Sequence, residues 1–220
     1  MAKFFKNNGL TIVLMLMFLA TVIGQWLTGW RFENEELVRH GEQPIGLIAF
    51  LGDAQFLSTL FENWESEFLQ MAVFVVLTAI LFQKGSAESE DPDQPWRDGR
   101  LSHMRGGKRS PAAVRKGPVV RWLYAHSLGI VLLILFIASF LLHWIFSAKF
   151  AAEEAALHGK PAESLGQYLS SAQLWFESFQ NWQSEFLSTA VLVVLSIWLR
   201  QKDSPESKRV TAPHDKTGTD

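Results

Sequence analysis

The chain has 220 residues, of which 48% are hydrophobic and 19% are charged, and its formal net charge is −2. The absence of cysteine excludes disulfides, thiolate metal sites and thiol redox chemistry. Since the length alone would suit one soluble domain, the distribution of the apolar residues decides the class of protein.

Two long apolar stretches indicate a membrane protein. Leu10–Thr28 and Leu128–Phe146 contain no Lys, Arg, Asp or Glu, and each is close to the roughly 20 residues that a helix needs to cross a bilayer. Two shorter runs of the same kind, Phe68–Phe82 and Phe186–Leu199, follow them. We therefore predict four transmembrane helices, over about residues 10–28, 64–83, 123–146 and 182–200.

The chain contains an internal duplication. Asn8–Ser89 aligns with His126–Ser207 without a gap, and 34 of the 82 aligned residues are identical. Lys3 and Lys6 followed by an apolar stretch resemble a signal peptide, but the stretch recurs in mid-chain, so we expect it to be retained. Because each copy has two spans, both copies enter the membrane in the same orientation, with a pseudo-twofold axis along the membrane normal.

The positive charges predict the orientation of these spans. Lys and Arg concentrate before the first span, in the segment 83–121 and in the tail from Arg200, whereas the segments 31–67 and 148–185 are rich in acids. Cytoplasmic segments of membrane proteins carry the excess of Lys and Arg. We expect both termini and the segment between the copies to be cytoplasmic, and the two acidic loops to face outward.

Composition predicts how these parts are divided. The segment between the copies is rich in charge, Gly, Pro and Ser, which is typical of a disordered connector. It is either a solvated tether or a basic surface for anionic lipid, at roughly 1 kcal/mol per basic residue, and it lacks the folded basic face that a nucleic acid requires. The predicted parts are a first two-helix repeat over 1–90, a disordered basic cytoplasmic linker over 91–118, a second two-helix repeat over 119–207, and a disordered tail over 208–220.

The second helix of each copy has a clear predicted start. Asp53 and Ser171 each precede Ala-Gln and an apolar pattern, as helix N-caps do. No Gly or Pro interrupts Ala54–Gln83, so one helix could run about 45 Å there. Such a helix places Glu67, and likewise Glu185, about one turn inside the outer edge of a hydrocarbon core of about 30 Å.

Polar residues at helical spacing supply these glutamates with partners. We predict that polar stripes of the four helices meet inside a bundle and form a layer near the outer face. Three interpretations stay open, namely wet boundary charges, a buried structural network, and a proton- or cation-conducting site. The predicted layer consists of Gln25, Asn63, Glu67, His143, Asn181 and Glu185.

The outer loops contain a weak candidate metal set. EELVRHG recurs as EEAALHG, so Glu36 with His40, and Glu154 with His158, stand at i, i+4. Two carboxylates and two imidazoles gathered about the twofold could bind a metal. We favour the alternative that each His lies in the last turn of a helix that the following glycine ends, where a cationic ring suits the helix dipole.

No cofactor is expected. His126 and His143 are the histidines predicted on the spans, and both lie on one helix, so they do not ligate one haem iron from opposite faces. No phosphate loop, HExxH motif or serine elbow occurs.

Three stretches carry a family resemblance. GQWLTGWR at Gly24–Arg31, FENWESEFLQ at Phe61–Gln70 and QKGSAES from Gln83 resemble a family of uncharacterised bacterial membrane proteins that is defined only as a domain of unknown function. The resemblance spans nearly the whole chain. It implies a bacterial inner-membrane location and no assigned activity, cofactor or catalytic residue.

These observations predict an all-α polytopic membrane protein that is not an enzyme. The leading hypothesis is a structural or partner-binding membrane component, with a protein partner or further copies of the chain as candidates for binding. The alternative is a small proton or cation permeation protein that uses Glu67 and Glu185. A third hypothesis is a membrane enzyme or metal site on the two Glu-His pairs of the outer loops.

Overall fold

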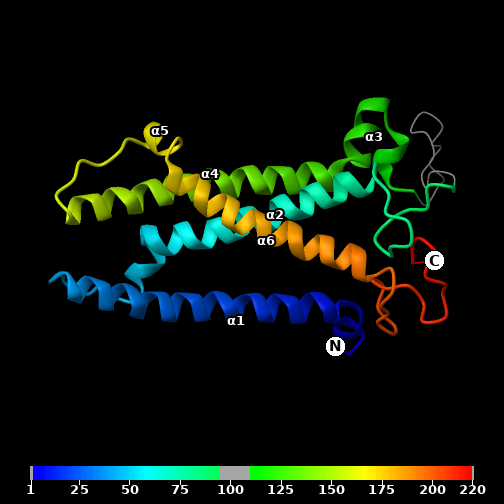
Figure 1. Ribbon diagram of the computed structural model, residues 1–220, viewed down its shortest axis with the longest axis horizontal. Helices are drawn as coiled ribbons and strands as arrows, with labels where there is room; N and C mark the ends of the chain where they lie inside the picture. Colours follow the sequence, from blue (N-terminus) through cyan, green and yellow to red (C-terminus); the bar gives the residue numbers. More distant parts are fainter. Residues whose placement is uncertain (1, 95–109, 220) are drawn as a thin grey trace. The chain divides into compact units, whose positions relative to one another are not determined.

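The computed structural model of the protein describes residues 2–94 and 110–219, and its regular elements are helical (Figure 1). No strand occurs in these residues, which confirms the predicted all-α class. Six α-helices and two short 3-10 helices follow one another in the described residues. They are α1 (Ala2–Arg39), η1 (Ala49–Gly52), α2 (Ala54–Thr78), η3 (Ala112–Arg115), α3 (Pro118–Ala125), α4 (Ser127–Leu157), α5 (Leu165–Tyr168) and α6 (Ala172–Leu195).

The predicted N-caps of α2 and α6 are confirmed. Asp53 Oδ1 accepts a hydrogen bond from the backbone N–H of Gln55 at 2.9 Å. Ser171 Oγ accepts one from the N–H of Leu174 at 3.2 Å. Each cap satisfies a backbone donor that the first turn of a helix leaves without a helical partner.

The ends of α1 and α4 are also built alike. Gly41 and Gly159 have φ angles of 80° and 65°, in the left-handed region that favours glycine. After each glycine the chain turns back, since Glu42 N–H donates to the Leu37 carbonyl at 2.9 Å and Lys160 N–H donates to the Ala155 carbonyl at 2.8 Å. This is a Schellman motif, and it confirms the predicted helix ends at the two glycines.

Two predicted helices end earlier than expected. The sequence predicts that the helix from Ala54 reaches Gln83, but α2 ends at Thr78, and α6 ends at Leu195 rather than near residue 200. The backbone N–H of Gln83 donates to Ser89 Oγ at 2.9 Å, and that of Gln201 donates to Ser207 Oγ at 2.9 Å. In a longer helix these two N–H groups would donate to backbone carbonyls. They donate to the serine hydroxyls instead, and each helix ends before them.

The predicted span 123–146 is interrupted near its start. His126 has φ and ψ angles of −110° and 7°, outside the helical range, and it separates α3 from α4. Its ring lies over the Trp122 ring, with 4.6 Å between centroids, and its Nδ1 lies 2.8 Å from the Trp122 carbonyl oxygen. The continuous helix therefore begins at Ser127.

The chain divides into two compact units, which do not follow the predicted division into repeats. The first unit is Met1–Leu60 with His143–Leu165, and the second is Phe61–Leu142 with Gly166–Asp220. Each unit thus takes residues from both copies of the duplication. Residues 95–109, in the middle of the predicted linker, lie outside the described residues, and part of the remainder of that linker forms η3.

In the first unit, α1 is hydrogen-bonded to the loop that follows it. The indole N–H groups of Trp26 and Trp30 donate to the carbonyls of Leu47 and Ile45, at 2.9 and 2.8 Å. Gly29 gives room for the buried Phe50 ring, because a Cβ there would lie 3.1 Å from a ring carbon. The loop therefore runs back along the last turns of α1.

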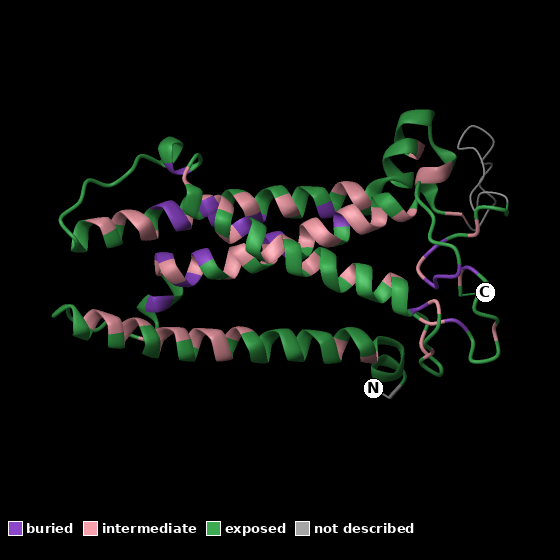
Figure 2. Ribbon diagram, viewed as in Figure 1, coloured by how far each residue is buried: buried purple, intermediate pink, exposed green. Residues whose placement is uncertain are grey.

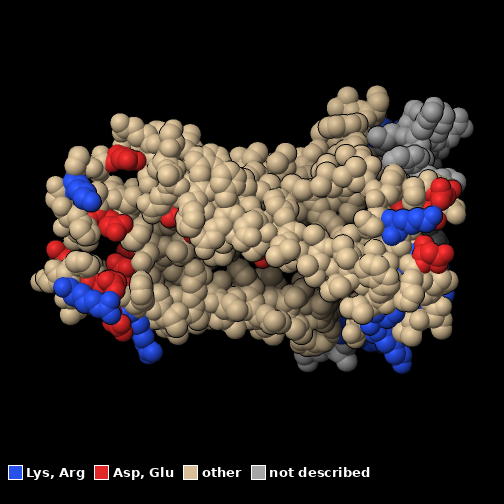
Figure 3. Space-filling view, viewed as in Figure 1, with Lys and Arg blue, Asp and Glu red and all other residues tan. Residues whose placement is uncertain are grey.

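Two helices in the described residues, α1 and α4, are long and apolar enough to cross a membrane, and α2 and α6 do not meet that criterion. The apolar side chains of both are largely outside the protein core: Leu10 is 76% exposed and Leu128 is 62% exposed. Figure 2 shows α1 as exposed or half-buried along its length. Figure 3 shows charged side chains at the two ends of α1 and none over its middle. Such a helix suits an apolar environment better than water.

In the second unit, the segment 201–219 folds back onto the turn 83–89, where the sequence predicts a disordered tail from residue 208. Lys208 is buried, and its Nζ donates to the carbonyls of Gly85, at 2.5 Å, and His214, at 2.9 Å. Burial lowers the pKa of Lys208, because removal from water penalises the charged form. Hydrogen bonds from the Lys208 ammonium group to backbone carbonyls hold this segment in place, although its composition alone predicts disorder.

The same region holds two equivalent glutamates of the two copies. Glu88 is half-buried, and its Oε1 has no hydrogen-bond partner among the described residues. Burial raises the pKa of Glu88, and the nearby Glu206 carboxylate raises it further. The ionised form of Glu88 is therefore unfavourable in the folded protein.

Replacing Glu88 with Gln should stabilise the protein at neutral pH. A carboxyl whose pKa is raised by folding contributes stability below its ordinary pKa of 4.5 and loses it as the pH rises through the raised folded value. The variant should therefore melt at a higher temperature than the wild type at pH 7 and at nearly the same temperature at pH 4. Thermal unfolding in detergent measures this, with Glu42→Gln in an exposed loop as control. An equal effect of both variants at pH 7 would rule the explanation out.

Candidate functional site

Three polar contacts join α2 to α6 in the second unit, and we call the six residues that form them the polar seam. Figure 1 shows the two helices running in the same direction. Each contact is a side-chain hydrogen bond between the helices. The pairs are Glu62 with Asn181 (2.5 Å), Glu65 with Trp182 (2.8 Å) and Gln70 with Thr189 (2.7 Å).

The register of the polar seam matches the duplication. The paired residues lie 119, 117 and 119 positions apart in the chain. Each value is within one residue of the spacing that relates aligned residues of the two copies, such as Asn8 and His126. Equivalent levels of α2 and α6 therefore contact each other, as expected for two parallel helices related by a twofold axis.

Glu65 is the buried acid of the polar seam. It has no exposed surface, and its Oε1 accepts the indole N–H of Trp182. Burial removes hydrogen bonds to water, and the indole N–H of Trp182 replaces one of them for the Glu65 carboxyl. The same face of α2 presents Glu62, one turn earlier, to the amide of Asn181.

The two copies differ in charge at these positions. Glu62 and Glu65 align with Gln180 and Gln183, so the first copy has carboxyls where the second has amides. Both types accept hydrogen bonds, but only the carboxyl binds and releases a proton. The polar seam is thus a structural contact that also contains two titratable carboxyls, both on α2.

The predicted polar layer is divided between the two units. Gln25 and His143 belong to the first unit, where His143 is fully buried and Gln25 Nε2 donates to Thr59 Oγ1 at 3.3 Å. The other four members belong to the second unit. There Asn63 and Glu67 are exposed, and Asn181 and Glu185 are half-buried.

The sequence analysis missed the two acids of the polar seam. On α2 the predicted layer contains Asn63 and Glu67, which lie about two-fifths of a turn from the face that holds Glu62 and Glu65. The buried glutamate of α2 is therefore Glu65 rather than Glu67. The difference between Glu and Gln at aligned positions of the two copies was the available signal.

The Glu-His pairs of the outer loops end α1 and α4 in the first unit. His40 and His158 lie in edge contact, with 6.0 Å between ring centroids. The Glu36 carboxylate pairs with Arg39 on its own helix. No group of three or more His, Asp or Glu side chains that could hold a metal occurs in the described part of the chain. The structure thus brings the two imidazoles together without the two carboxylates.

Removing the indole N–H of Trp182 should destabilise the second unit. The Trp182→Phe variant keeps an aromatic ring but leaves the buried Glu65 carboxyl without that donor, which costs about 1–3 kcal/mol. The melting temperature in detergent should fall by several degrees. Trp175→Phe is the matched control, because the indole of Trp175 donates to the Leu169 carbonyl in an exposed contact, at 2.9 Å. A loss no larger than that of the control would contradict the role assigned to Trp182.

Comparison with known proteins gives the chain a family and adds no activity. No curated protein and no solved structure matches the chain. Residues 1–219 match the model of a family described as a domain of unknown function (DUF6766), and the chain therefore belongs to that family.

Proposed function

We propose that the protein is a structural, non-enzymatic component of the bacterial inner membrane that crosses it four times. In this proposal two parallel two-helix repeats pack about a pseudo-twofold axis along the membrane normal. Its role is to hold a helical bundle that binds a protein partner or further copies of the chain.

The observation that carries this proposal is the register of the polar seam. Helices in a membrane gain little from apolar contact, since lipid tails are equally apolar, so hydrogen bonds and close packing hold them together. Three hydrogen bonds between equivalent levels of α2 and α6 supply such a contact. Helices that run in parallel at the same level are what a duplication of an even number of spans predicts.

Equivalent local contacts in the two copies support the repeat. They include an indole that donates to a loop carbonyl, a helix end closed by a left-handed glycine, and a serine that binds the backbone after the second helix. The indole pairs are Trp26 with Leu47 and Trp144 with Leu165, the glycines are Gly41 and Gly159, and the serines are Ser89 and Ser207.

The dimensions of the helices also suit this proposal. α1 and α4 supply two spans by length and composition. α2 and α6 have 25 and 24 residues, or about 36–38 Å at 1.5 Å per residue, which exceeds a core of about 30 Å. The acids and other polar residues near the starts of α2 and α6 lower the hydropathy of these helices. The polar seam gives some of these side chains hydrogen-bond partners inside the protein.

The cytoplasmic placement of the C-terminal tail and the outward placement of the segment 148–185 are tested by cysteine labelling. Because the natural chain has no cysteine, Ala162→Cys and Val210→Cys each create a single thiol at an exposed position. A membrane-impermeant maleimide should label Ala162→Cys in intact cells with a permeabilised outer membrane. It should label Val210→Cys only after the inner membrane is opened. The reverse pattern, or labelling of both in intact cells, would overturn the topology.

A second candidate function is proton or cation permeation along the pseudo-twofold axis. It is favoured by the electrostatic interaction between Glu67 and Glu185, which repeat at the same level of α2 and α6. Two carboxylates near one mouth would attract cations. The basic segment between the copies could in either case rest on anionic lipid.

Flux through liposomes separates the two candidate functions. If the protein is structural, purified wild type and the Glu67→Gln/Glu185→Gln variant should both leave proton and potassium gradients intact. If it conducts, the wild type should dissipate a gradient, and the double variant should lose most of that flux. Correct insertion is checked with the single-cysteine proteins, and wild-type flux that the variant abolishes would replace the structural proposal.

A further inference from the structure

His40 and His158 form a pair that the proposed structural role does not use. They are aligned residues of the two copies, and each directly follows the last residue of a long helix, Arg39 of α1 or Leu157 of α4. Their rings stand edge to face, with 6.0 Å between centroids and 69° between planes. Both side chains are exposed, so solvent and small ions reach them.

The hydrogen bonds of the two rings use the same nitrogen, Nδ1, on each. His40 Nδ1 lies 2.9 Å from the Glu36 carbonyl oxygen, and His158 Nδ1 lies 2.9 Å from the Glu154 carbonyl oxygen. A carbonyl only accepts hydrogen bonds, so in the neutral ring Nδ1 carries the proton and Nε2 carries the lone pair. Histidines that bind metals through Nε2 are commonly oriented by such a bond from Nδ1 to a carbonyl.

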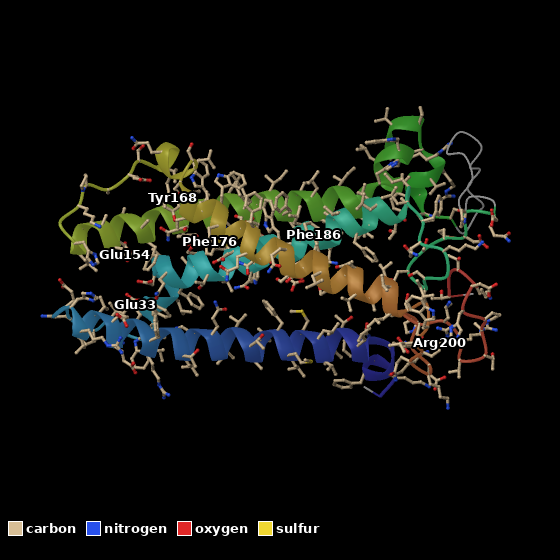
Figure 4. All side chains as sticks on the ribbon, in the orientation of Figure 1. Glu33, Glu154, Tyr168, Phe176, Phe186 and Arg200 are labelled. Atoms are coloured by element: carbon tan, nitrogen blue, oxygen red, sulfur yellow. The ribbon has the colours of Figure 1, made fainter. Side chains whose placement is uncertain are left out.

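The surroundings of the pair favour a cation. Both rings stand at helix C-termini, where the helix dipole places partial negative charge. Glu33, nearby on α1, interacts electrostatically with Asp53, Glu36 and Glu153. Figure 4 shows Glu33 of α1 and Glu154 of α4 toward this end of the first unit. Two of these acids have a basic partner, since Glu36 pairs with Arg39 and Glu153 pairs with Lys149.

We propose that His40 and His158 form an open site for a borderline divalent cation, with Zn²⁺ as the natural candidate. Zinc binds imidazole nitrogen at about 2.0–2.1 Å with near-tetrahedral angles, which places the centroids of two ligating rings about 5–6 Å apart. Imidazole selects zinc, copper and nickel over magnesium and calcium. Because no third His, Asp or Glu completes a cluster among the described residues, water fills the remaining positions.

A metal ion bound at this site would link the two copies. One ligand comes from the first copy and one from the second, so the ion joins the ends of α1 and α4. A ligand that binds only the folded arrangement stabilises it by mass action. The site depends on the first unit alone and not on the membrane topology or on permeation.

Zinc titration of the full chain tests the site. Protein purified in detergent and stripped with EDTA should bind one Zn²⁺ per chain by calorimetry, and its melting temperature should rise with added Zn²⁺ but not with Mg²⁺. His40→Ala and His158→Ala should each weaken binding by more than about tenfold, the lower end of what the loss of even an outer-shell partner costs. Both positions are exposed, so both variants are expected to fold.

His126→Ala is the matched control. His126 Nδ1 makes the same kind of contact, 2.8 Å from the carbonyl of the residue four positions earlier, but its ring neighbours an indole rather than a second imidazole. This variant should bind zinc like the wild type. Wild-type binding no tighter than that of the His40→Ala/His158→Ala double variant would overturn the proposal, as would equal losses in all three single variants.

Discussion

Three hydrogen bonds between α2 and α6 fix the register between the two halves of the chain. Apolar faces of helices tolerate a shift by one turn, because each ridge finds another groove of similar shape. Hydrogen bonds do not tolerate it, since a one-turn slip would separate Glu65 from Trp182 and leave a carboxyl buried without its donor. In the proposed membrane setting no other force distinguishes a neighbouring helix from lipid as strongly.

This constraint explains why a duplicated protein need not keep its two copies identical. Glu62 and Glu65 of α2 contact Asn181 and Trp182 at nearly the equivalent level of α6, so one acid with one donor on the other helix suffices for a bond. Two acids at every level would repel each other, as the electrostatic interaction between Glu67 and Glu185 illustrates. The aligned residues of the second copy, Gln180 and Gln183, are uncharged and exposed, so the two acids of the polar seam come from α2 alone.

Local features of the fold could be predicted from the sequence because short-range chemistry determines them. The N-caps at Asp53 and Ser171 and the helix ends at Gly41 and Gly159 depend on a few neighbouring residues, and all four are confirmed. The C-terminal ends of α2 and α6 were predicted too far along, because Ser89 and Ser207 compete for backbone donors six residues earlier. No apolar pattern contains that information.

The candidate site was harder to predict because it depends on the rotation of a helix about its axis. Several faces of α2 carry polar residues, and the pattern alone does not say which face meets α6. Asn63 and Glu67 were predicted to join the polar layer, but Glu62 and Glu65, on another face of α2, bond Asn181 and Trp182. The structure of the tail was also hard to predict, because it depends on Lys208, which donates to the carbonyl of the distant Gly85 and to that of the nearby His214.

The bond between Lys208 and the Gly85 carbonyl also sets an order of events during synthesis. The two residues are 123 positions apart, so at about 5–20 residues per second the ribosome adds Lys208 roughly 6–25 s after Gly85. The first copy therefore leaves the ribosome with this turn still open, and the arrival of Lys208 and Thr217 closes it. The contacts between the turn at Gly85 and the tail therefore form late, after the helices that make the polar seam have been synthesised.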